Sequence, residues 1–164
     1  MSGQNRHLKG DTNEMIMPVR GKTVIDAGDF VWQQPNDSWY LLPVSSWKDS
    51  STTGACGTDV AQYFAGVALE SSPSGVTENI TVATAGVFRY PLAHKSAVTV
   101  GFIVSAVTNK AAGGSSNQYV ENSEILTTGT TIRYGIIVKT QSATSFVDFM
   151  LMTKFSGATA QIGT

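Results

Sequence analysis

A chain of 164 residues with 41% hydrophobic content is long enough for one domain with a substantial core. Only 14% of the residues are charged, against roughly 25% in soluble domains, so uncharged polar residues must cover much of the surface. The net charge of −1 argues against general nucleic-acid binding, and a single cysteine excludes an internal disulfide.

The N-terminus shows no targeting signal. The first 13 residues lack the apolar core of a secretory signal, and no apolar run approaches the roughly 20 residues that span a bilayer. We therefore expect a protein that is made in a cytoplasm and has no membrane partner.

Residues 1–20 are predicted to form an extended N-terminal arm. The first part is polar and charged and has too few apolar residues to fold alone, whereas a short apolar run follows it. The pattern is consistent with a frayed terminus and also with an arm that a partner orders. If a partner orders the arm, the predicted contact residues are Arg6, Lys9, Met15, Ile16, Met17, Val19 and Arg20.

From residue 21 the pattern is that of short β-strands separated by turns, and residues 21–164 are predicted to form a single domain. Apolar and β-branched runs predict two short strands over 22–26 and 29–33, or one bent strand across both, followed by strands over 39–44 and 60–70. Between the last two of these strands lies a long polar loop, residues 45–59.

The middle of the chain continues the β pattern. Alternating apolar and polar residues predict a strand over 76–82, and a strand over 85–90 is expected to end at Pro91, because proline lacks a backbone donor. Residues 97–107 are strongly apolar and predict one central strand. A Gly-rich stretch at 109–118 predicts a flexible loop.

Residues 130–140 and 145–155 predict the clearest hairpin of the chain. Its second strand is almost continuously apolar from Phe146 to Met152, so we expect both of its faces to be covered. No internal repeat is apparent. The whole pattern predicts an all-β fold, a compact antiparallel β-barrel or β-sandwich.

The sequence contains no recognisable catalytic or metal-binding pattern. Cys56 lies in a Gly-rich stretch, but its spacing from His7 and His94 matches no nucleophile signature. The two histidines and one cysteine lie too far apart for a zinc site, and the acids near the early turns are better explained as turn residues. We therefore expect no enzymatic activity, no cofactor and no metal.

Aromatic residues gather in the first third of the body. Packing in the core or at a sheet edge is the expected role of Trp32 and Trp39, because large aromatic side chains dominate small β cores. For Trp47, in its polar loop, packing and stacking on a sugar ring both remain open.

Four segments follow one another in a suggestive order. They are a strand entered through a Gly-Asp turn, an Ala-Gly-Val strand and two later β-branched strands, at Val24–Val31, Tyr63–Glu70, Ile80–Phe88 and Val98–Val104. This order resembles the small capsid-decoration (cement) proteins of tailed bacteriophages, which have a β-barrel or β-tulip body. The 45–59 loop and the C-terminal hairpin are additions to that pattern.

The resemblance implies a structural virion protein on the outer surface of the capsid that stabilises the major capsid lattice. Its partners would be the major capsid protein and further copies of itself, with a trimer favoured over a dimer. An alternative is a glycan- or receptor-binding β-module of a phage head or tail fibre that uses Trp47 and Tyr40. A hydrolase on a β-sandwich is the third reading.

Overall fold

A computed structural model describes residues 6–9, 12–34, 39–46, 63–73, 78–109, 114–123 and 133–155. Within these ranges the chain forms eleven β-strands and one 3-10 turn, which confirms the predicted all-β fold. The first half contains β1 (Arg6–Lys9), β2 (Glu14–Pro18), β3 (Phe30–Gln33), β4 (Leu41–Pro43), η1 (Val44–Ser46), β5 (Phe64–Ala68) and β6 (Asn79–Ala83). The second half contains β7 (Val87–Val98), β8 (Ile103–Asn109), β9 (Gly114–Ser123), β10 (Arg133–Ile137) and β11 (Gln141–Leu151).

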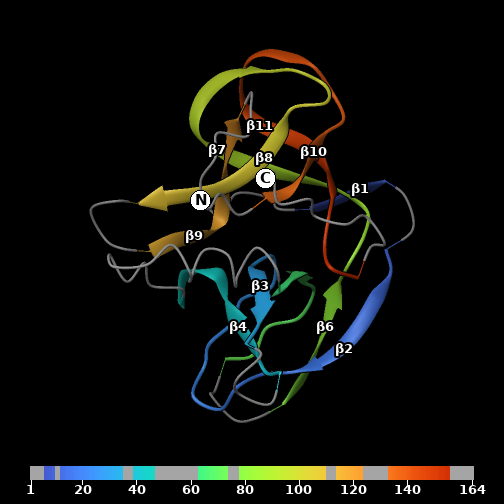
Figure 1. The fold of residues 1–164 in the computed structure, drawn as a ribbon, viewed down its shortest axis with the longest axis vertical. Coiled ribbons are helices and arrows are strands. Elements are labelled where there is room, and N and C mark those ends of the chain that lie inside the picture. Colours follow the sequence, from blue (N-terminus) through green and yellow to red (C-terminus); the bar gives the residue numbers. More distant parts are fainter. Residues whose placement is uncertain are drawn as a thin grey trace, which may run out of the picture.

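The strands form two sheets that lie one above the other along the longest axis of the molecule (Figure 1). The first sheet has the order β2-β6-β5-β3-β4, and the second has the order β1-β7-β11-β10-β8-β9. In the second sheet β9 also pairs with β7, which closes five strands into a barrel.

In each sheet, one parallel contact joins the two ends of a row of five strands and closes it into a ring. Five strands that alternate in direction around a ring must contain one pair that runs in the same direction. In the second sheet this pair is β7 and β9, joined at Leu92 and Val120. In the first sheet it is an isolated parallel bridge between Val19, directly after β2, and Leu41 of β4.

Apart from β1, the two sheets have the same topology. If the strands of each are numbered one to five along the chain, β2 to β6 and β7 to β11, both have the spatial order 1-5-4-2-3. In both, the first and third strands make the parallel contact. We call β2–β6 the first repeat and β7–β11 the second repeat. The structure thus contains an internal duplication that was not apparent in the sequence.

The correspondence extends to single residues of the fourth strand. Gly66 of β5 lies opposite Val31, and Gly135 of β10 lies opposite Val104. A register irregularity follows immediately in both repeats. A side chain on either glycine would collide with a backbone carbonyl oxygen of the fifth strand. Glycine is required at both positions for the same reason, close approach of two backbones.

The turn before the second strand is also shared. Gly28 and Gly101 have φ values of 92° and 88°, in the left-handed region that favours glycine. The amide of Gly28 donates to the carbonyl of Ala68 at 2.7 Å, and the amide of Gly101 donates to that of Ile137 at 3.0 Å. The same residue type therefore closes the same turn in each repeat.

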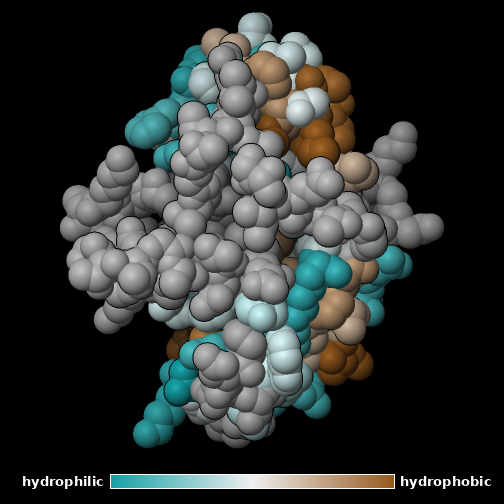
Figure 2. All heavy atoms as spheres, in the orientation of Figure 1, coloured by the Kyte–Doolittle hydropathy of each residue, from teal (hydrophilic) through white to brown (hydrophobic). Residues whose placement is uncertain are grey.

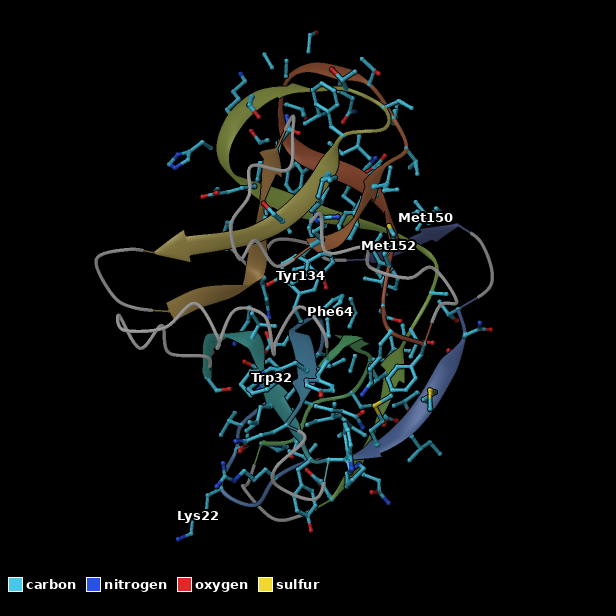
Figure 3. The ribbon with its side chains drawn as sticks, in the orientation of Figure 1. Lys22, Trp32, Phe64, Tyr134, Met150 and Met152 are labelled. Atoms are coloured by element: carbon cyan, nitrogen blue, oxygen red, sulfur yellow. The ribbon has the colours of Figure 1, made fainter. Side chains whose placement is uncertain are left out.

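One hydrophobic core spans both sheets. Residues of the first repeat that face the second sheet, such as Phe30 and Phe64, belong to the same buried cluster as Tyr90, Tyr134 and Phe149 of the second. The ring of Phe30 stacks on Tyr134 with centroids 3.9 Å apart and on Tyr90 at 4.4 Å. Figure 3 shows Tyr134 and Phe64 meeting where the two sheets join. The two repeats therefore share one core and are not separate domains joined by a linker.

A smaller cluster fills the interior of the first sheet. Because side chains alternate along a strand, Phe30 and Trp32 of β3 face the shared core, whereas Val31 faces this second cluster with Leu41 and Ile80. Both faces of β3 are covered, which explains its unbroken apolar run.

The predicted end of the strand over 85–90 is wrong. Strand β7 does not end at Pro91 but runs through it to Val98. The amide of Leu151 donates to the carbonyl of Gly86, so the even-numbered residues at the start of β7 direct their backbone N–H and C=O groups toward β11. Pro91 is odd-numbered, and its nitrogen therefore points away from β11. The missing N–H of proline therefore breaks no hydrogen bond between these strands.

The predicted strand over 97–107 is two strands, because the Gly101 turn separates β7 from β8. Of the predicted strand over 22–26, only a single bridge between Ile25 and Ser72 is present. The predicted loop at 109–118 contains the start of β9. The C-terminal hairpin is confirmed, with β10 and β11 paired.

Candidate interaction surfaces

The apolar residues of the predicted arm divide between the interior and the surface. Met17 and Val19 are buried in the smaller cluster, whereas Ile16 is 74% exposed and Met15 is 39% exposed. Of these four apolar residues, only Ile16 and Met15 are accessible to a partner while the sheet stays closed. Arg20 is exposed, and its guanidinium donates to the side-chain oxygen of Gln34 at 3.3 Å.

The remaining two predicted contacts, Arg6 and Lys9, lie in β1, which pairs with β7. Their side chains lie outside the described part of the structure. The expectation that this N-terminal segment meets a partner stays a prediction.

Strand β2 lies at the edge of the first sheet. The amide of Val19 donates to the carbonyl of Glu78 and the amide of Thr84 donates to that of Asn13, both at 2.7 Å. The odd-numbered residues of this segment therefore direct their backbone groups toward β6. Even-numbered residues direct theirs away from the sheet.

The second sheet presents an apolar outer face. Alternation along β10 and β11 turns Val138, Phe146 and Met150 outward, with exposed fractions of 40–46%. Between these side chains the guanidinium of Arg89 donates twice to the carboxylate of Asp148, at 2.7 and 2.8 Å. These two charges thus compensate each other. We call this surface the outer face.

Sequence reasoning missed the outer face. The nearly continuous apolar run of β11 was expected to be covered on both sides, and this prediction is wrong for Phe146 and Met150. A strand with an apolar outer row either packs under another layer or remains exposed, and periodicity alone does not distinguish these cases. In Figure 2 hydrophobic residues gather on the upper part of the molecule and, lower down, near β2.

Asp29 joins the two repeats below the surface. The residue is 4% exposed, and its carboxylate accepts hydrogen bonds from the amide of Asp26 at 3.0 Å and from the side chain of Gln118 in β9 at 2.8 Å. Burial raises the pKa of Asp29 above its ordinary value, although these hydrogen bonds act in the opposite direction. The hydroxyl of Tyr90 donates to the carbonyl of Gly28 nearby. These contacts hold the start of β3 against the barrel.

Three aromatic rings surround the ammonium group of Lys154. Its nitrogen lies 4.9 Å from the ring centroid of Trp39, 5.4 Å from that of Tyr63 and 4.7 Å from that of Phe155. Burial lowers the pKa of Lys154. The cluster fastens the chain after β11 to the first sheet through cation–π contacts.

Trp32 and Trp39 both take the expected packing roles. Trp32 is 6% exposed in the shared core. Trp39 is 48% exposed, with a backbone φ of 60° that strains a bulky residue, and its ring packs edge-on against that of Tyr63 with centroids 5.7 Å apart. Tyr40 is partly buried. Trp47 and Cys56 lie outside the described residues.

The described ranges contain no group of three His, Cys, Asp or Glu side chains that could hold a metal ion. Nor do those ranges include a helix with the length and apolar character needed to cross a membrane. The exposed His94 lies within β7 rather than in a turn.

Comparison with known proteins gives a weak structural likeness. No protein-family model matches the chain, and no curated protein matches its sequence. Among solved structures, the chain is similar to the N base of the head fiber protein gp8.5 of bacteriophage phi29, with 12% identity and a TM-score of 0.43. The alignment covers 85% of this chain and 94% of that one. A superposition this loose transfers no function, so the proposals below rest on the residues of this chain.

Proposed function

We propose that the protein is a non-catalytic structural component of a phage virion that binds the outside of the head and stabilises the major capsid lattice. The outer face is the observation that carries this proposal. Val138, Phe146 and Met150 expose large apolar side chains on the barrel, around an ion pair whose two charges compensate each other. Exposed apolar side chains gathered on one face are typical of surfaces that bind other proteins.

The order of the β segments supports the same proposal, since it resembles that of decoration proteins. Every copy that binds only the assembled lattice raises the free energy needed to disrupt it, because binding draws the equilibrium toward the assembled state. Contacts repeated by the symmetry of the head add through avidity. A catalytic site is not needed for this role.

The test uses purified heads that lack a decoration protein. We expect the protein to saturate the head surface in a regular lattice, visible by electron microscopy, and to raise the temperature at which the heads rupture. Met150→Glu, which places a charge on the outer face, should weaken head binding roughly tenfold or more.

Tyr119→Ala is the matched control, because Tyr119 is 44% exposed on β9 and lies outside this face. Absence of binding by the wild-type protein would refute the proposed function. Equal binding by wild type and Met150→Glu would instead show that another surface meets the head.

A further inference from the structure

We propose that β2 is the contact strand of a homodimer, in which the Glu14–Ile16 edge of one copy pairs antiparallel with the same edge of a second copy. The inference goes beyond the proposed role on a phage head and does not depend on it, because both partners are copies of this chain. It rests on the internal duplication, which shows what the equivalent edge does elsewhere in the same molecule.

The two repeats differ at this edge. In the second repeat the first strand, β7, pairs on its outer side with β1 along Val87 to Arg89. The equivalent residues of the first repeat are Glu14 to Ile16. Within the described residues they have β6 on one side only, and the closing bridge of the sheet begins later, at Val19. An edge that accepts an antiparallel strand in one repeat is open in the other.

The open edge carries four backbone hydrogen-bonding groups. Because odd-numbered residues face β6, Glu14 and Ile16 each direct one N–H and one C=O outward. Pro18 limits the ladder, since it has no N–H to offer. The available stretch is therefore short and has a defined end.

The side chains beside this edge are unusually apolar for a surface. Ile16 is 74% exposed, the largest exposed fraction among the large hydrophobic residues that the structure describes, and Met15 is 39% exposed. In Figure 1, β2 runs along the outside of the first sheet, where a second molecule can approach it. An exposed apolar edge strand invites pairing unless a protein protects it.

A second copy fits this edge because the edge is self-complementary. In an antiparallel pair with its two-fold axis at Met15, Glu14 of each copy lies opposite Ile16 of the other. Every outward N–H and C=O of these two residues then has a partner. The contact also closes on itself, since each copy uses its open edge once.

The alternative register, with its axis at Ile16, leaves one of the four outward groups of each copy, the Glu14 carbonyl, without a partner. It places Glu14 opposite Pro18 of the second copy, and Pro18 cannot donate a hydrogen bond to the Glu14 carbonyl. The Met15-centred register is therefore favoured. A two-fold contact of this kind gives a dimer rather than the trimer that the family resemblance implies.

Sedimentation velocity tests the dimer in solution. For so short a ladder we expect dissociation constants of about 10–100 µM, typical of small, transient interfaces. Ile16→Pro removes an outward N–H but no hydrogen bond to β6, and should weaken dimerisation at least roughly tenfold. Ile16→Thr keeps the N–H and should weaken dimerisation less. Val138→Thr, on the outer face, is the matched control and should leave it unchanged.

Cysteine cross-linking tests the register even if Ile16→Pro fails to fold. In a Cys56→Ser background, Met15→Cys places two thiols at a non-hydrogen-bonded pair with Cα atoms about 4.5 Å apart, within disulfide range. Ile16→Cys would place its two Cα atoms more than about 7 Å apart, beyond that range. We expect mild oxidation to yield covalent dimers of Met15→Cys and few of Ile16→Cys.

Three results would overturn the proposal. They are a monomer at concentrations up to about 1 mM, dimerisation that Ile16→Pro does not change, and cross-linking that favours position 16 over position 15. If the protein stays monomeric yet Ile16→Pro abolishes binding to phage heads, the edge receives a strand of a head protein instead. If the dimer forms and heads are not bound, only the proposed head function fails.

Discussion

At the scale of single residues, two buried tyrosines near the join of the repeats have different environments. The hydroxyl of Tyr90 donates to the carbonyl of Gly28, whereas that of Tyr134 has no hydrogen-bond partner within the described part of the chain. Burial raises the pKa of both phenols, so both stay neutral. A buried polar group without a partner costs free energy that a paired one does not.

The first prediction compares the two hydroxyls. Tyr134→Phe removes an unpartnered group and should leave the free energy of unfolding unchanged or raise it by about 1 kcal/mol. Tyr90→Phe leaves the carbonyl of Gly28 without its donor and should lower that free energy by about 1–2 kcal/mol. Urea denaturation of both variants measures the difference. Equal losses would contradict this account.

The second prediction concerns the pH dependence of Asp29. Its pKa is raised in the folded state above the ordinary value of 3.8, so the folded protein binds more protons than the unfolded chain between these two values. Lowering the pH through this window should therefore make wild type more stable relative to Asp29→Asn. Urea denaturation of both proteins at several pH values measures this difference. A pH-independent difference would refute the argument.

At the scale of elements, the glycine of the fourth strand is the residue that each repeat can least replace. Nothing in the φ of Gly135 requires glycine, but a Cβ there would collide with the carbonyl of Met150 and with the ring of Phe149. Gly101 presents the opposite case, with a positive φ and open space around the position of its Cβ. A substitution at Gly135 therefore tests the cost of a steric clash, and a substitution at Gly101 tests the cost of backbone strain.

The third prediction follows from that contrast. Gly135→Ala should cost about 3 kcal/mol or more, because two backbones must move apart to admit the methyl group. Gly101→Ala should cost only about 1 kcal/mol, the penalty for a left-handed alanine. Thermal and urea unfolding of the two variants provide the measurement. A larger loss for Gly101→Ala would reverse the explanation.

How much of the fold the sequence predicts can be judged at the same scale. Apolar alternation identified most strands and the β10–β11 hairpin, because each pattern is local. The duplication escaped notice because few residue types are shared at equivalent places, among them Gly28 with Gly101 and Pro18 with Pro91. These residues serve turns and edges, whereas the core positions between them need only be apolar and differ in size. The open edge of β2 was likewise beyond prediction, since it depends on which strand lies beside it.

At the scale of the whole molecule, the shared core couples the two repeats. Phe30 belongs to the first sheet but stacks on Tyr90 and Tyr134 of the second. The Asp29 and Lys154 contacts cross the same boundary from other directions. If either sheet unfolds, the face of the other that lines the shared core loses its cover, so we expect one cooperative transition.

The fourth prediction tests this coupling. Phe30→Ala should lower the free energy of unfolding by about 3–5 kcal/mol and destabilise both repeats together. Tryptophan fluorescence, which includes Trp32 and Trp39 of the first sheet, and amide NMR signals of β10 and β11 should give the same midpoint. Val100→Ala, at a 53% exposed turn position, is the control and should change stability by less than about 0.5 kcal/mol. Separate midpoints would show that the repeats unfold independently.

The spatial order of the strands has a consequence for how such a chain can be assembled. In each repeat the first strand pairs with the last, so the repeat starts and finishes in the same place: Glu14 lies opposite Ala83, and Val87 lies opposite Met150. Only Thr84, Ala85 and Gly86 then separate one repeat from the next. A repeat whose first and last residues lie side by side can be excised, copied or circularly permuted with a linker of a few residues. The architecture therefore makes tandem copying of a gene segment a physically small step.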